Sequence, residues 1–168
     1  MESTITEKTE AEASVPLSKE ELRGRMHVFE SALGQTPGAK FGDDACPVEH
    51  HFGDGLYIRE MKGIKGTVVV TKLHKTNHPY FVMAGDVSII TEDGPVRVKA
   101  PYWGITKAGT KRVGYFHEDT IWITVHSTKE TDLEKIEEET IAQSYDELPE
   151  DVKLRLGIES EVQLCLGS

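Results

Sequence analysis

The residues best suited to chemistry lie close together in the sequence: Lys72, His74 and His78. Lys72 and His74 are separated by one residue, and alternate side chains of a β-strand point to the same face. His78 follows a short turn at residues 75–77, so it can approach His74 from the next strand. Two imidazoles on adjoining strands are a common start for a divalent-metal site. The spacing therefore predicts a pocket with two histidines and a lysine.

Short strand-like segments surround these residues. They are rich in β-branched and aromatic residues and are separated by turns, with Glu92-Asp93-Gly94 as a good hairpin turn. The predicted strands are 56–61, 66–74, 79–84, 86–91, 95–100, 102–107, 111–117 and 120–127. This pattern is typical of an all-β sandwich or barrel, which we place at residues 46–128.

The N-terminal part of the chain has a different composition and pattern. Residues 1–17 contain almost nothing apolar to bury and are predicted to be a disordered tail. Ser18 and Glu21 have the spacing of a capping box, which predicts an amphipathic helix over 18–34. Residues 34–55 are rich in Gly and Pro and are predicted to be an irregular connector.

After the strands the pattern becomes helical again, over residues 131–168. Thr131 and Glu134 have the spacing of a second capping box. Apolar residues then recur at helical spacing, at Leu133, Ile136, Ile141 and Tyr145. The final segment is a C-terminal extension that we expect to cover a sheet edge or to meet another subunit.

Composition excludes several classes of protein. The chain has 168 residues, enough for one domain with its own core, and a formal net charge of -10, which opposes sequence-independent nucleic-acid binding. No apolar segment reaches the length of a membrane span. The only cysteines, Cys46 and Cys165, form no zinc-binding pair and indicate a reducing cytosol. There is neither a nucleophile elbow nor a phosphate-binding glycine loop.

The spacing of Gly66, Lys72, His74, His78 and Gly85 is similar to the first motif of the cupins, G-x5-H-x-H-x3-E-x6-G. In that motif two histidines and a glutamate on neighbouring strands hold a divalent metal. Here a lysine stands at the first histidine position and a histidine at the glutamate position. The resemblance implies a double-stranded β-helix, a jelly-roll barrel, whose metal site has altered ligands.

The second cupin motif, G-x5-P-x-G-x2-H-x3-N, is matched only loosely. Its histidine position holds Arg112, which cannot coordinate a metal, and its proline position holds Lys107. More narrowly, the chain resembles short cupin-like proteins carried by tailed bacteriophages. The segments that carry this resemblance are KLHKTNH, KAGTKRVGYFHEDTIW and HSTKETDLEKIEEE, at 72–78, 107–122 and 126–139.

Two interpretations of the pocket follow. In the first, His74 and His78 bind Fe, Mn, Ni or Zn, and a third ligand comes from His117, His126 or the His50-His51 pair. The alternatives for these residues are ordinary: His117 can cap a turn and His126 can simply pack in the core.

In the second interpretation there is no metal, and the two histidines join a cationic cluster with Lys72 and Arg112 that binds a carboxylate or phosphate. Tyr80 and Tyr115 are candidates to line the same cavity. Arg112 has an ordinary alternative too, an ion pair with a carboxylate such as Glu118 or Asp119.

The sequence does not specify a reaction. The leading expectation is a small-ligand-binding protein of phage type, active as a homodimer or higher oligomer in the host cytoplasm. A rival is a non-catalytic structural or accessory module that contacts phage structural proteins on the virion. A third expectation is an inhibitor that sequesters a signalling nucleotide of host defence.

Overall fold

A computed structural model describes residues 16–40 and 42–158. The expected disordered tail therefore lies almost entirely outside the described residues, as does the end of the C-terminal extension from residue 159 onward. None of the described helices is long and apolar enough to cross a membrane.

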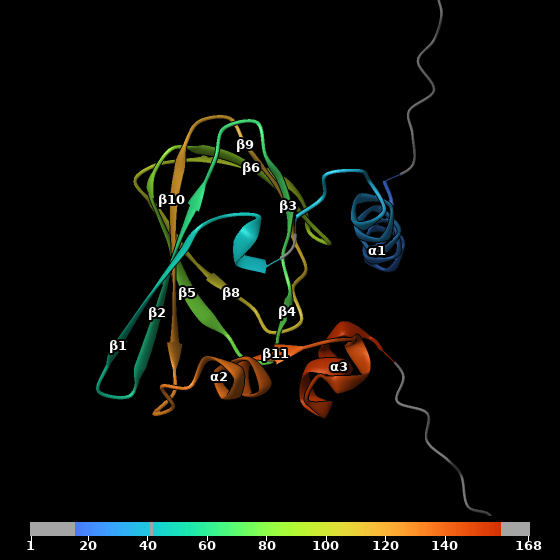
Figure 1. Cartoon of the computed structure of the whole chain (residues 1–168). Coiled ribbons are helices and arrows are strands. Elements are labelled where there is room, and N and C mark those ends of the chain that lie inside the picture. The colour runs from blue at the N-terminus through green and yellow to red at the C-terminus, as the bar shows by residue number, and fades with distance from the viewer. Residues whose placement is uncertain (1–15, 41, 159–168) are drawn as a thin grey trace, which may run out of the picture.

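Antiparallel strands form two facing sheets (Figure 1). The larger sheet has the order β1-β2-β10-β5-β8 and the smaller one β3-β9-β6-β7, while β4 and β11 pair separately. The larger sheet comprises β1 (Val48–Gly53), β2 (Leu56–Gly63), β5 (His78–Ala84), β8 (Tyr102–Thr106) and β10 (Thr120–Ser127). The others are β3 (Val68–Val70), β4 (Leu73–His74), β6 (Asp86–Thr91), β7 (Gly94–Lys99), β9 (Val113–Phe116) and β11 (Ile141–Ala142).

From β5 onward the chain winds back and forth between the two sheets. β5, β8 and β10 belong to the larger sheet, whereas β6, β7 and β9 belong to the smaller one. This winding is that of a double-stranded β-helix, or jelly roll. The predicted all-β, cupin-type barrel is confirmed, and seven of its predicted strands match the observed ones to within two residues at each end.

Two apolar clusters hold the fold together. The first fills the space between the sheets and contains Tyr80, Val82, Val87, Ile89, Val98, Phe116 and Cys46. The second closes the lower end of the barrel and contains Leu73, Ala108, Ala142, Leu148, Val152 and Leu156. The end of the barrel that carries β4 is thus sealed by the C-terminal segment (Figure 1).

Among the described residues, the barrel is accompanied by three helices, α1 (Lys19–Gly34), α2 (Leu133–Thr140) and α3 (Glu150–Leu156), and by two short 3₁₀ turns, η1 (Gly42–Asp44) and η2 (Tyr145–Glu147). The predicted capping box of Ser18 and Glu21 begins α1. Met26 is the buried residue of this helix. Ion pairs from Arg23 to Glu92 and from Lys111 to Glu30 join α1 to the barrel.

Three sequence predictions are wrong in detail. The connector 34–55 contains strand β1, because its last residues pair with β2. The predicted strand 66–74 is broken at residues 71 and 72 into β3 and β4. Asp132, rather than Thr131, caps α2, since its carboxylate accepts from the amides of Glu134 and Lys135.

The turn between β5 and β6 depends on a glycine. Gly85 has a φ of +95°, and a Cβ there would lie 2.7 Å from the Asp119 carbonyl oxygen and 2.8 Å from Thr120 Cα. Gly94, in the hairpin between β6 and β7, has a φ of +104° with no atom within 4 Å of such a Cβ. The two glycines thus share a backbone conformation and differ in crowding.

We predict that Gly85→Ala lowers the free energy of unfolding by about 2–4 kcal/mol, because strain and overpacking add. Gly94→Ala is the matched control and should cost only the conformational part, about 1–2 kcal/mol. Urea denaturation of both variants measures the difference. Equal losses of unfolding free energy in the two variants would contradict the prediction. They would show that crowding between the β5–β6 turn and the start of β10 adds no cost.

Candidate metal centre

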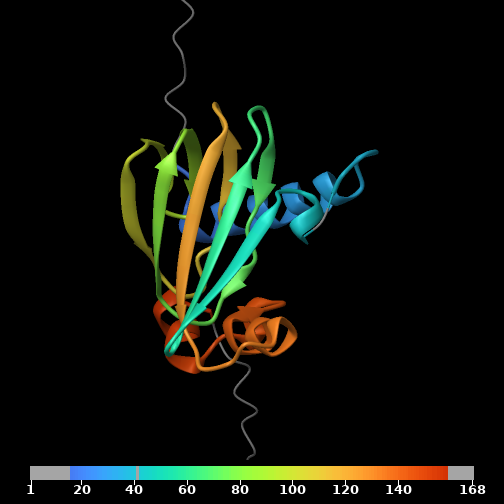
Figure 2. The same cartoon turned by 60° about the vertical axis from the view of Figure 1, so that its left-hand side comes forward.

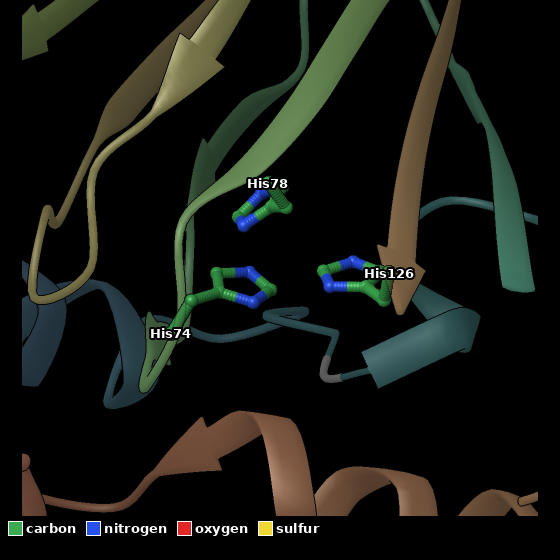
Figure 3. A group of neighbouring side chains, drawn as sticks. All are labelled: His74, His78 and His126. Carbon is green, nitrogen blue, oxygen red and sulfur yellow. The ribbon is translucent and has the colours of Figure 1, made fainter. Parts of the chain in front are cut away.

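Three histidines from three strands meet inside the barrel. His74 lies in β4, His78 begins β5, and His126 lies near the end of β10. Figure 3 shows the three rings turned toward one another, and one nitrogen from each ring lies within 4.8 Å of the others. Ring centroids are 4.2 Å apart for His74 and His78, and 4.4 Å apart for His78 and His126. His78 and His126 are buried, and His74 is half-buried.

Strand pairing explains why His78 and His126 meet. Thr124 of β10 lies opposite Tyr80 of β5 in an antiparallel ladder. Two residues further along each strand, on the same face, come His126 and His78. This face points into the barrel, because Tyr80 is also buried there.

His74 is placed by a separate set of contacts. Leu73 is buried in the lower apolar cluster, so its neighbour His74 points the other way, toward the barrel interior. The backbone of His74 is held on both sides: it is paired with Ile141 of β11, and its carbonyl accepts from the amide of Gly109. The C-terminal segment therefore fixes the position of the third imidazole.

The ring nitrogens suit metal coordination. His74 Nδ1 and His126 Nδ1 are buried without a hydrogen-bond partner in the described chain. His126 Nε2 lies 3.2 Å from Thr124 Oγ1, and His78 Nδ1 lies 3.4 Å from the Thr76 carbonyl oxygen. These contacts orient the rings and leave a nitrogen on each of His78 and His126 for a ligand bond. Buried polar atoms without partners require an explanation, and a bound cation supplies one.

Burial keeps the three imidazoles neutral, as metal ligation requires. It lowers the pKa of His74 to about 2, with further lowering by the neighbouring His78 and His126. It also lowers the pKa of His78 to about 4, assisted by His126, and that of His126 to about 4, assisted by Arg59.

A half-buried arginine lies beside the histidines. Arg112 donates from Nη1 to Thr106 Oγ1 at 2.7 Å, and its guanidinium lies 4.9 Å from the centre of the Tyr80 ring. Thr106 is the cross-strand partner of His78, which places the guanidinium next to the cluster. Within residues 16–40 and 42–158, the neighbours of the Arg112 guanidinium are Thr106, Tyr80 and Tyr102 rather than a carboxylate, so the alternatives Glu118 and Asp119 do not apply. Burial lowers the pKa of Arg112.

Lys72 does not enter the barrel with His74, contrary to the sequence prediction. Because the strand is broken at this point, alternation does not carry from residue 72 to residue 74. The Lys72 side chain is half exposed and forms an ion pair with Glu137 of α2. It is therefore a surface contact between the barrel and this helix.

Two other predicted residues also lie elsewhere. His117 Nε2 is 2.8 Å from Ser88 Oγ, and its ring packs edge-on against Tyr115. Tyr115 is exposed, because its neighbour Phe116 takes the inward position on β9. His117 and Tyr115 thus form a surface pair on the smaller sheet. Of the predicted ligand-binding residues, Arg112 and Tyr80 are the two that lie beside the histidines.

Arg59 is a charged neighbour that the sequence prediction missed. It lies opposite Thr124 on β2, and its charge contributes to the lowered pKa values of His74 and His126. Alternation within the predicted strand 56–61 could have indicated that Arg59 points inward, because it shares a face with Tyr57 and Met61.

Comparison with known proteins gives only distant matches. No protein-family model and no curated protein matches the chain. Among solved structures, KdgF from Halomonas sp. has a TM-score of 0.47 and 14% identity over 56% of this chain and 90% of its own. Ectoine synthase from P. lautus has a TM-score of 0.46 and 14% identity over 56% of this chain and 72% of its own.

A third match is an RmlC-like cupin family protein with a double-stranded β-helix fold from Methanocaldococcus jannaschii. It has a TM-score of 0.43 and 15% identity, over 54% of this chain and 88% of its own. The similar solved structures are thus cupin-superfamily proteins, and at this distance their activities do not transfer to this chain.

We predict that the metal-free protein loses stability as the pH falls below about 6.5 toward 4. In this range the histidines of the unfolded chain bind protons, whereas the three buried imidazoles stay neutral, so protons favour unfolding. Urea midpoints measured between these pH values in the presence of a chelator test this. His126→Asn should flatten the pH dependence, and His117→Asn, outside the cluster, should leave it as steep. An identical slope in both variants would contradict the prediction.

Proposed function

We propose that this protein binds a divalent transition metal through His74, His78 and His126 and holds a small anionic ligand beside it. The observation that carries the proposal is the convergence of three neutral imidazoles, two of them with buried ring nitrogens that have no partner among the described residues. Fe, Mn, Ni and Zn all accept such ligands. A metal held by three imidazoles keeps coordination positions open and polarises an oxygen atom bound there.

Arg112 is the residue that we assign to the ligand. Its side chain is half-buried, uncompensated by any described carboxylate, and close enough to the cluster to lower the pKa of His74 and His78. A planar fork of N–H donors matches a carboxylate, and the cation–π contact with the Tyr80 ring helps to hold the guanidinium in place. A small carboxylic acid would therefore place one oxygen toward the histidines and its charge against the arginine.

The second candidate is a non-catalytic structural or accessory module of phage type, which the sequence resemblance implies. An exposed apolar face on the larger sheet favours it, because such faces mark interaction sites. Under this proposal the imidazoles are remnants of a site, and the protein carries no metal. Metal content therefore separates the two candidates.

We predict near-stoichiometric metal in native protein purified without chelators and measured by elemental analysis. A His74→Ala/His78→Ala double variant should lose it, whereas His117→Ala, which removes an imidazole outside the cluster, should retain it. Adding the identified metal to chelator-treated protein should raise the unfolding free energy by about 2.7 kcal/mol at one hundred times its dissociation constant. Metal-free native protein that gains no stability from added metal would overturn the metal proposal.

We predict that metal-loaded protein binds succinate, used as a probe, in an Arg112-dependent manner. Arg112→Gln should weaken binding about 10- to 100-fold, because a charge-assisted hydrogen-bond pair is lost. Lys72→Gln is the matched control, since this lysine pairs with Glu137 outside the barrel. Calorimetric titration of the three proteins, with thermal unfolding as a check on folding, measures the effect.

Equal affinity in all three proteins would remove Arg112 from the ligand site. Binding of a nucleoside monophosphate to metal-free protein, in place of succinate, would instead support the third expectation, a protein that sequesters a nucleotide.

A further inference from the structure

A polar cavity of about 220 Å³ lies outside the barrel, where α1, the end of α3 and two connecting segments meet. The connecting segments are the turn between β6 and β7 and the loop between β8 and β9. α1 lies beside the barrel and α3 at its lower end (Figure 1). Figure 2, in which the larger sheet faces the viewer, shows α1 behind the barrel and the C-terminal helices below it. The cavity therefore shares no wall with the histidine cluster.

The lining of this cavity is basic, although the chain as a whole has a formal net charge of -10. It contains four basic and two acidic side chains, so positive charges exceed negative ones by two. The charged residues are Lys19, Arg23, Lys107, Arg155, Glu92 and Asp93. The hydrogen bond from Lys19 lowers the pKa of Asp93, and the charges of Lys107 and Arg155 lower it further. These cations therefore act on the same small volume.

Both carboxylates of the cavity are already paired with a basic residue. Arg23 donates from Nη1 to Glu92 at 2.7 Å, and the two side chains are only 13% and 11% exposed. Nη2 of Arg23 donates to the carbonyl oxygen of Leu156 at 3.0 Å, which joins α1 to the end of α3. Asp93 pairs with Lys19 at the exposed rim. The acidic residues are thus neutralised by two of the four basic ones.

The other two basic residues, Lys107 and Arg155, form no ion pair within residues 16–40 and 42–158. Nη2 of Arg155 donates to the carbonyl oxygen of Ala108, which leaves further N–H groups of the guanidinium for a ligand. Thr110 adds a hydroxyl group to the same lining. Two like charges that face one cavity oppose each other unless an anion lies between them.

The loop that carries Lys107 is held in place by the chain itself. The amide of Thr110 donates to the Lys107 carbonyl oxygen at 3.1 Å, and the amide of Ala108 donates to Asn77 Oδ1 at 2.8 Å. Donors fixed in this way lose little conformational freedom when a ligand binds.

We propose that this cavity is a second binding site, separate from the histidines, and that it takes a phosphate group, either as the free ion or as part of a small molecule. Phosphate carries about -1.5 to -2 charges at pH 7 and offers several strong acceptor oxygens. This charge matches the two cations that no described carboxylate compensates. An arginine fork and a lysine point charge are also the usual residues that bind phosphate.

Size and charge argue against the other small ligands. The cavity is smaller than the roughly 300–1,000 Å³ of pockets for drug-sized molecules, so contacts with the phosphate group itself should dominate binding. A single carboxylate carries one negative charge, which would leave one of Lys107 and Arg155 uncompensated.

Calorimetric titration of inorganic phosphate into chelator-treated full-length protein tests this proposal, because phosphate cannot then bind to a metal at the histidines. The wild type should bind phosphate, and Lys107→Gln/Arg155→Gln should weaken binding about 100-fold, since two charge-assisted contacts are lost. Lys99→Gln/Lys129→Gln, which removes two exposed lysines elsewhere, is the matched control and should bind as the wild type does.

Folding is checked by circular dichroism and thermal unfolding. Lys107→Gln alone removes no hydrogen bond that its side chain makes to the described residues, so it gives a second measurement if the double variant fails to fold. It should weaken phosphate binding about 10-fold.

No phosphate binding by the wild type up to about 10 mM would overturn the proposal. Equal affinity in the Lys107→Gln/Arg155→Gln variant and its control would overturn it as well, and so would loss of binding in Arg112→Gln instead. Tighter binding of glycerol 3-phosphate than of inorganic phosphate, with the same dependence on Lys107, would support a phosphate monoester as the ligand, and the reverse order would support the free ion. Metal content is independent of these outcomes, because no histidine of the cluster lines the cavity.

Discussion

The antiparallel pairing of β5 with β10 is the constraint on which the rest of this structure depends. It places Tyr80 opposite Thr124, and the same register brings His78 and His126 together inside the barrel. A shift by one residue would exchange the two faces of a strand, which would turn an imidazole outward and Phe81 or Ile123 inward. That exchange would bury more apolar side chains at the level of the histidines, so the observed register needs sources of stability elsewhere in the interior.

Those sources come from both ends of the interior. Tyr80 and Val82 pack in the core between the sheets, with Trp122 stacked on Tyr80 at a centroid distance of 4.8 Å. At the lower end, β11 and the C-terminal cluster hold β4 against the barrel and so fix His74. The polar interior is thus confined to a band between two apolar regions. A bound metal would offset the remaining cost of the unpartnered imidazole nitrogens in this band.

The electrostatics of the interior are consistent with one anion beside one cation site. Burial lowers the pKa values of the three histidines, which removes their charge, while the guanidinium of Arg112 persists because arginine retains its proton in proteins. A positive charge this close to the histidines weakens the binding of a dication unless an anion accompanies it. The metal and the acidic ligand are therefore expected to support each other's binding.

Local sequence patterns determined most of the strands, the first helix and the two histidines on either side of the turn between β4 and β5. These features depend on alternation, capping and turn chemistry, which act over a few residues. The same local reasoning failed to place Lys72, because the strand is broken there and the side chains of residues 72 and 74 no longer share a face. It also chose the wrong N-cap for α2, because Asp132, next to the predicted Thr131, caps the helix instead. Strand β1 was missed because a Gly- and Pro-rich segment can still pair when a partner strand is present.

Only the tertiary structure decided which third histidine joins His74 and His78. The sequence left both His126 and His117 open as the third ligand, and sheet pairing separates them by the face and the strand end to which it assigns each. The same holds for the exposed apolar side chains of the larger sheet, such as Met83 and Trp103, since alternation tells which residues share a side but not which side is the interior. The sequence by itself therefore determined the elements and the chemical types available. Long-range pairing between strands, which no local pattern encodes, determined which of those side chains meet.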